Sequence, residues 1–247
     1  MSYQSSYLLS KTDLEKDIHI PRWLSIQYKT WSKIVGDFNF PCYFGVAAQK
    51  SGHLFFSYIE NDDFTHLPST LISFLEVTEK TSSERNALVL FVQPEKVERE
   101  TAYYHDYFWK ILNFLHEHDK YDWPKDFPLD PDDPKWEFIF HKTPIFISAN
   151  GPFYKNRITR NLGDCLILIF QPRRIFADLS STPKGKKATQ IIRANVEKIE
   201  GMPTHPDLGS YGDPNNREWK QYVITDDNNT TKGSCPFHHE KFIMKNN

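Results

Sequence analysis

The chain has 247 residues, and its 30 basic and 32 acidic side chains give a formal net charge of −2. This balance provides no general positive field, so we expect neither nucleic acid nor an anionic membrane as a partner. Aromatic residues make up 15% of the chain, which excludes disorder throughout and offers apolar area to line a pocket. A small-molecule substrate is therefore expected, and the composition leaves the oligomeric state open.

The sequence also predicts a cytoplasmic location. Its longest apolar run, residues 165–170, is much shorter than the roughly 18–20 residues of a membrane-spanning helix. The first residues lack the basic start and apolar middle of a secretory signal. Three cysteines, an odd and low number, do not indicate a disulfide framework.

The first predicted helix covers residues 22–35. Pro21 suits its opening turn, and Gly36 suits its end. Four large apolar residues are expected to share its buried face: Trp23, Ile26, Trp31 and Ile34. The segment that follows, residues 40–45, is predicted to be a turn-rich connection because it joins a proline to a glycine.

Helices and strands then alternate along the chain. The expected order is strand 53–59, helix 68–79, strand 87–92, helix 95–117, an acidic proline-rich loop at 123–134, strands 136–140, 144–148 and 166–170, and helix 184–200. From Gly201 onward the chain is expected to be irregular. This interleaving predicts an α+β fold with a single mixed sheet flanked by helices. We expect one domain over residues 1–247, with 1–20 as a loosely ordered amino-terminal segment.

No strong catalytic signature is present, since the sequence lacks the GxGxxG, GxxxxGK[ST], HExxH and GxSxG patterns. Cys42 lies beside Pro41 in the turn-rich segment, where a thiolate can face a metal or a substrate. The competing interpretation is a small thiol packed beneath a turn. Cys235, with His238 and His239 close behind, has donor atoms for zinc but lacks a second cysteine pair.

Four arginines lie near the two ends of the strand at 166–170: Arg157, Arg160, Arg173 and Arg174. Guanidinium groups hold carboxylates and phosphates through paired hydrogen bonds, so these side chains can grip a substrate carboxylate or a cofactor propionate. Alternatively, they pair with the many acidic side chains of the chain itself.

The irregular stretch 203–222 is rich in glycine and proline, which select backbone angles rather than packing. His205 lies between Thr204 and Pro206, a rigid position suited to a metal ligand or a general base. The alternative is an ordinary surface loop.

Several short motifs, taken in order, resemble the bacterial YqcI/YcgG-like family over about residues 40–237. They are Phe40-Pro41-Cys42, Asn156-Arg157 with Arg160, Phe170-Gln171-Pro172 leading to Phe176, Gln221-Tyr222, and Cys235-Pro236-Phe237. Some relatives are haem-dependent monooxygenases that hydroxylate a guanidino nitrogen of arginine or of an arginine-derived metabolite.

The resemblance implies an iron-dependent oxidoreductase that binds haem and N-hydroxylates a guanidino or amine metabolite. His205 is then the first candidate for the iron ligand and Cys42 the second, with Cys235 a weaker metal candidate. The four arginines would neutralise the propionates or hold a substrate carboxylate. The expected substrate-binding residues are Asp207, Asp213, Glu218, Trp219 and Tyr222, whose carboxylates can bind a cationic guanidinium.

The sequence departs from the haem-dependent relatives at two positions. Gly151-Pro152 stands where they carry a His-Pro pair, and Arg173 stands where they carry a histidine. The alternative function is therefore a diverged protein without haem that binds an anionic small molecule through its arginines.

Overall fold

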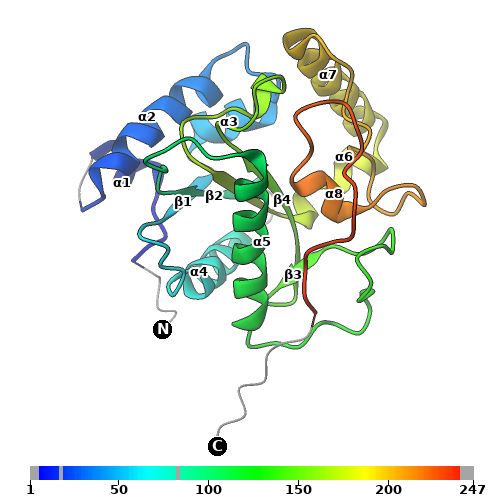
Figure 1. Ribbon diagram of the computed structural model, residues 1–247, viewed down its shortest axis with the longest axis horizontal. Helices are drawn as coiled ribbons and strands as arrows, with labels where there is room; N and C mark the ends of the chain where they lie inside the picture. Colours follow the sequence, from blue (N-terminus) through cyan, green and yellow to red (C-terminus); the bar gives the residue numbers. More distant parts are fainter. Residues whose placement is uncertain (1–5, 17–18, 82–83, 240–247) are drawn as a thin grey trace, which may run out of the picture.

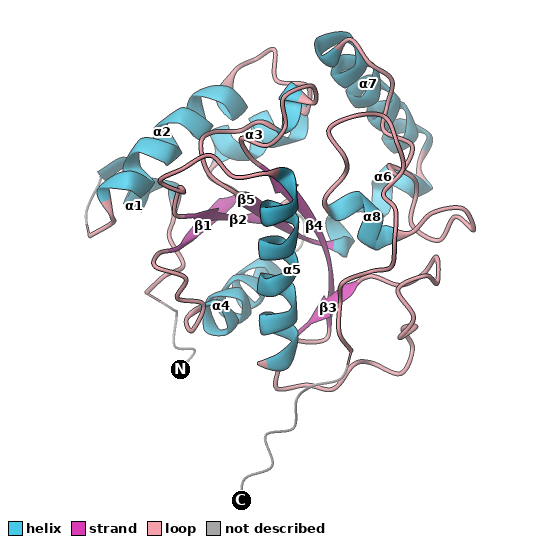
Figure 2. Cartoon of the chain, viewed as in Figure 1, coloured by secondary structure: helices cyan, strands magenta, loops and turns pink. Residues whose placement is uncertain are grey.

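The computed structural model describes residues 6–16, 19–81 and 84–239. Its centre is a five-stranded sheet in the order β1-β2-β5-β4-β3, built from the strands β1 (Leu54–Ile59), β2 (Ala87–Val92), β5 (Ile167–Pro172), β4 (Thr143–Asn150) and β3 (Phe138–Phe140) (Figure 2). β1 and β2 run parallel, and the other neighbours are antiparallel. This mixed sheet with flanking helices confirms the α+β prediction.

Helices cover both faces of the sheet (Figure 1). The helices α1 (Lys11–Lys16), α2 (Arg22–Gly36) and α3 (Tyr43–Ser51) share one core with the strands, and α4 (Leu67–Lys80) and α5 (Thr101–Glu117) share the other. β2 separates the two cores, because Val89 and Phe91 belong to the first and Leu88 and Leu90 to the second. Alternate side chains of a strand point to opposite faces, so a strand covered on both sides is apolar throughout.

The carboxyl-terminal half adds further helical elements around β4 and β5. They are η1 (Ile158–Arg160), η2 (Arg173–Phe176), α6 (Ala177–Ser181), α7 (Pro183–Glu200) and α8 (Glu218–Tyr222). α8 packs against β4, and α7 lies at the edge of the molecule beyond α6 (Figure 1). Long irregular connections link these elements. Around these connections, charged side chains from segments far apart in the sequence form ion pairs.

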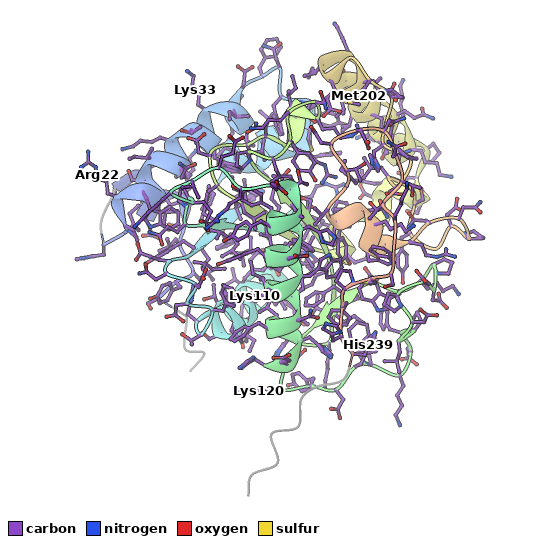
Figure 3. The ribbon with its side chains drawn as sticks, in the orientation of Figure 1. Arg22, Lys33, Lys110, Lys120, Met202 and His239 are labelled. Carbon is purple, nitrogen blue, oxygen red and sulfur yellow. The ribbon has the colours of Figure 1, made fainter. Side chains whose placement is uncertain are left out.

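The first predicted helix is confirmed, but its predicted buried face holds only in part, because Trp31 is buried and Trp23 and Ile34 pack against the same core while Ile26 does not. Ile26 is 52% exposed, whereas Leu24 and Tyr28 are buried. The contact with the sheet follows Leu24, Tyr28, Trp31 and Val35, at spacings of four, three and four residues. Arg22 and Lys33 point away from the sheet (Figure 3).

Other boundaries also differ from the predictions, and α8 interrupts the stretch after Gly201 that was expected to be irregular. The segment 40–45 is not wholly a turn, because α3 begins at Tyr43. The long helix begins at Thr101 rather than at residue 95, since Glu100 has an extended backbone (φ −72°, ψ 159°). Residues 93–100 therefore form a loop, in which Val97 is 58% exposed.

The amino-terminal segment was predicted to be loosely ordered. Residues 1–5 and 17–18 of it lie outside the described residues. The described part is packed, because Leu14 of α1 is fully buried and Leu9 forms a two-way backbone pairing with Phe56 of β1. Within residues 6–16, 19–81 and 84–239, no helix has the length and apolarity needed to cross a membrane.

A glycine in α7 makes a close backbone contact that we expect to be intolerant of substitution. A Cβ at Gly185 would lie 2.1 Å from the carbonyl oxygen of Asp178. We expect Gly185→Ala to lower the free energy of unfolding by about 1–3 kcal/mol, because backbone must shift to admit the methyl group. Gly36→Ala is the matched control, since nothing lies within 4 Å of its Cβ position. Urea unfolding of both variants tests this, and equal stabilities would contradict it.

Candidate functional site

The most distinctive charged site of the described chain surrounds Arg173. This residue follows β5 directly and opens η2. Its Nε donates to Oε2 of Glu137 at 2.6 Å, and its Nη2 donates to Oε1 of Glu218. Both glutamate side chains are buried, with exposed fractions of 1% and 0%. One guanidinium therefore lies between two buried carboxylates, and we call this cluster the Arg173 site.

Aromatic rings complete the Arg173 site. The guanidinium carbon lies 5.6 Å from the ring centre of Phe146, 5.9 Å from that of Phe176 and 4.8 Å from that of Tyr211. Carboxylates accept the N–H groups of a guanidinium, and aromatic faces attract its positive charge. The surroundings of Arg173 thus have the chemistry of a guanidinium receptor.

Short-range contacts hold Glu218 in place. As the first residue of α8, it is followed one turn later by Gln221, whose Nε2 donates to Glu218 Oε2 at 2.9 Å. A longer contact of 3.4 Å comes from Nδ2 of Asn216. The carboxylate is therefore positioned by the amide groups of its own loop and helix.

The other two residues of α8 that the sequence singled out serve the scaffold. The Tyr222 hydroxyl accepts the backbone N–H of Phe138 at 3.0 Å and lies 3.4 Å from the carbonyl of Ile145, so it joins α8 to β3 and β4. The Trp219 indole N–H donates to Asp132 at 3.2 Å and joins α8 to the acidic loop. Both rings are buried.

The Arg173 site holds more negative than positive charge. Burial raises the pKa of Glu137 and of Glu218, and Arg173 opposes both shifts. Burial also raises the pKa of Tyr211 to about 12, and Glu137 adds to that shift. Two carboxylates facing one cation leave one carboxylate in excess, so the site favours a proton or a further cationic group.

The loop that joins α7 to α8, residues 201–217, covers the site through Tyr211, whose ring lies against the Arg173 guanidinium. The Tyr211 hydroxyl donates to the carbonyl of Lys135 at 2.8 Å. Gly212 has a φ of +80°, a conformation that favours glycine. Its backbone N–H donates to the carbonyl of Pro134 at 3.2 Å. The Arg173 side chain remains 22% exposed beneath this cover.

His205 lies in a different cluster and is buried. Its Nδ1 accepts the backbone N–H of Asp207 at 3.1 Å, so Nε2 carries the proton and donates to the Thr225 hydroxyl at 2.9 Å. The Asp207 carboxylate in turn accepts the hydroxyl of Thr230 and the backbone N–H of Thr231. Both ring nitrogens of His205 are therefore engaged.

Burial lowers the pKa of His205 to about 4, and the positive charges of Arg157 and Arg160 act in the same direction against Asp207. The neutral ring is favoured in the folded chain, so its contribution to stability is complete above pH 6.5 and lost as the pH falls toward 4. We expect His205→Asn to remove this acid sensitivity, which amounts to at most about 3 kcal/mol. Urea unfolding of the unmodified protein and of His205→Asn, from pH 7 to pH 4, measures this loss of stability. Parallel pH profiles of the two proteins would contradict the role of His205.

The predicted arginines do not converge on one site. Arg157 contacts Glu200 of α7 and residues 227–228, and Arg160 donates to the carbonyl of Ala149 at 3.3 Å. Arg174 donates to the carbonyl of Thr78 at 2.5 Å, on the side of α4. Asp213 is exposed and accepts the backbone N–H of Asn215. Of the predicted binding residues, only Arg173 and Glu218 belong to the Arg173 site.

Neither predicted iron ligand lines the large groove of the described residues. Both nitrogens of His205 are hydrogen-bonded, and burial raises the pKa of the Cys42 thiol at the start of α3. A surface groove of about 700 Å³ at the carboxyl ends of β1 and β2 has a suitable size, but its lining includes neither residue. Burial also raises the pKa of Cys235 to about 12, and no group of three metal-ligating side chains occurs in the described residues.

Sequence reasoning missed Glu137, Phe146 and Tyr211 of the Arg173 site. One signal was present, because Glu137 interrupts the apolar run at 136–140, and a carboxylate there must be buried with a partner. The partner itself is 36 residues away and belongs to another strand end.

Comparisons with known proteins place the chain in a family. The model of the YqcI/YcgG family matches residues 31–238. The chain is 33% identical over 244 residues to YcgG of Bacillus subtilis (strain 168), covering 95% of this chain and 96% of the relative. It is 32% identical over 248 residues to YqcI of the same strain, with 96% and 97% covered. The chain belongs to the YqcI/YcgG family.

A third relative has an enzyme name. The chain is 28% identical over 244 residues to "Putative N(omega)-hydroxy-L-arginine synthase DcsA" of Streptomyces lavendulae, covering 96% of this chain and 91% of the relative. No solved structure matches the chain. This relative is therefore named for the synthesis of N-hydroxylated arginine.

Proposed function

We propose that this protein N-hydroxylates the guanidino group of a small metabolite, and arginine is the first substrate to test. The Arg173 site carries the proposal, because there the fold holds a guanidinium between two buried carboxylates and three aromatic rings. The similarity to the relative named as an N-hydroxy-arginine synthase supports the same chemistry.

Two carboxylates can do useful work on a guanidino substrate. The guanidino N–H groups would donate paired hydrogen bonds to Glu137 and Glu218, which would fix the plane of the group and leave its third nitrogen free to react. Buried carboxylates with raised pKa values can also hold or release a proton near that nitrogen. These two residues would thus provide orientation and a local proton acceptor.

The overall reaction requires an oxidant and a reductant. One atom of molecular oxygen enters an N–H bond to give N–OH, and the other leaves as water with two electrons and two protons from an external donor. Haem, which the sequence resemblance predicts, supplies such oxygen activation when bound. Neither His205 nor Cys42 lines the groove at the ends of β1 and β2, so the haem remains a prediction and no step is assigned to it.

The test uses the full-length protein produced with added haem. Incubation with arginine, oxygen and a chemical reductant is expected to give a product heavier by one oxygen atom, identified by mass spectrometry as N-hydroxylated. Glu218→Gln should reduce the product at least tenfold, and Asp213→Asn, an exposed change on the same loop, should not. Failure to hydroxylate any guanidino compound by protein with a Soret absorption band would overturn the proposal.

The alternative of an anionic ligand held by free arginines has weaker support. Each of the four predicted arginines is engaged by a carboxylate or a carbonyl of the chain itself. An anion would therefore compete with partners already in place.

A further inference from the structure

We propose that the side chain of Arg173 is an internal ligand of the Glu137–Glu218 carboxylate pair, and that a guanidino compound binds by displacing it. This inference rests on the proposed function for the class of ligand and adds how the same site is controlled. Arg173 occupies the position that a substrate guanidinium requires. Such a substrate can therefore bind both carboxylates only when the Arg173 side chain has moved away.

The contacts of Arg173 are those of a replaceable group. Its described polar partners are the two glutamates, and a free guanidino compound offers both carboxylates the same N–H groups. Arg157 provides the contrast, since it is only 2% exposed and also donates to backbone carbonyls and to Asn228. Arg173, at 22% exposed, has a route to solvent.

The cover over the site is also suited to movement. The Tyr211 ring lies over the Arg173 guanidinium, and Tyr211 itself is 40% exposed. The loop is joined to the neighbouring segment through the Tyr211 hydroxyl and the Gly212 N–H, which donate to the carbonyls of Lys135 and Pro134. Loss of these two hydrogen bonds would open the outer side of the site while leaving Glu137 and Glu218 buried in the scaffold.

The charge balance favours an incoming cation. Because two carboxylates face one guanidinium, a second guanidinium is attracted before Arg173 has left. The measured affinity is then the intrinsic affinity reduced by the fraction of molecules in which Arg173 has moved out. Removal of the Arg173 side chain should therefore tighten binding of a guanidinium by at least tenfold.

Isothermal titration calorimetry with methylguanidinium chloride tests this on the full chain. Arg173→Ala should bind methylguanidinium at least tenfold more tightly than the unmodified protein, and it should not bind methylurea, which has a similar shape without the charge. Arg173→Lys is the matched control, because its ammonium still occupies the pair and should give no such gain. Equal affinity of the alanine variant and the unmodified protein would overturn the inference.

A second measurement does not depend on the folding of the alanine variant. The unmodified protein should bind methylguanidinium measurably, and Glu137→Gln should weaken that binding at least tenfold. Unchanged binding by Glu137→Gln would also overturn the inference. Neither titration requires oxygen, haem or turnover, so a failure of the hydroxylation assay and a failure of the displacement model are distinguishable.

Discussion

Arg157→Met is expected to lower the free energy of unfolding by about 3–5 kcal/mol, because it leaves a carboxylate buried without its cation. Arg157 and Glu200 form an ion pair of 3.0 Å whose side chains are 2% and 1% exposed. The guanidinium also donates to the carbonyl of Asp227 at 3.1 Å and to Asn228 at 2.8 Å. One side chain thus joins the end of α7 to the loop after α8.

Lys155→Met is the control for Arg157, because Lys155 forms an ion pair with Glu98 that is exposed on both sides. Its effect should stay within about 0.5 kcal/mol. Urea unfolding followed by circular dichroism compares the two variants with the unmodified chain. A loss of under 1 kcal/mol for Arg157→Met would show that Glu200 finds another partner or a proton.

Arg173→Met is expected to cost about 3 kcal/mol at neutral pH, since Glu137 and Glu218 then face each other without a cation. Burial raises the pKa of each glutamate above its ordinary value of 4.5 and Arg173 opposes this shift, so loss of the guanidinium should raise both pKa values further. The cost of holding both glutamates charged in the folded variant is therefore absent below pH 4.5 and grows as the pH rises through the folded pKa. The deficit of the variant should therefore be largest at pH 7 and shrink toward pH 4.5.

Glu137→Gln is the control for the stability of Arg173→Met. It leaves one carboxylate for one guanidinium, and its amide oxygen still accepts from Arg173 Nε. We expect a change of less than about 1 kcal/mol, because the lost ion pair is offset by the removal of an excess buried charge. Unfolding curves at pH 7 and pH 5 give both comparisons. A deficit of Arg173→Met that does not vary with pH would contradict the assigned charge balance.

The sheet and most helices could be predicted because their sequence patterns are local. The run at 87–92 is entirely apolar and forms β2 within those bounds, and the helix at 184–200 is extended by one residue, to Pro183. One error concerns the start of the long helix, where short-range side-chain contacts decide. Glu95, for example, accepts from the Tyr103 hydroxyl at 2.5 Å and pairs with Arg99. It therefore supports a loop instead of the predicted first turn of α5.

The site was harder to predict because its parts come from several chain segments. Glu218 was expected to bind a guanidinium, and the structure places it against one, although this guanidinium belongs to Arg173. The expected meeting of Cys42, His205 and the arginines occurs only in part. Arg157 and Arg160 lie close enough to His205 to lower its pKa, whereas Arg173 lies at the other end of β5 and Cys42 at the start of α3. Residue type indicates what a side chain can bind, but the topology decides which partner is within reach.

The backbone pairing of Leu9 with Phe56 has a consequence for self-association. β1 is the outermost strand on its side of the sheet, and an open strand edge is a template on which a second molecule can add a strand. The two hydrogen bonds of 2.8 Å between Leu9 and Phe56 occupy the middle of that edge. The amino-terminal segment thus shields the sheet from intermolecular strand addition.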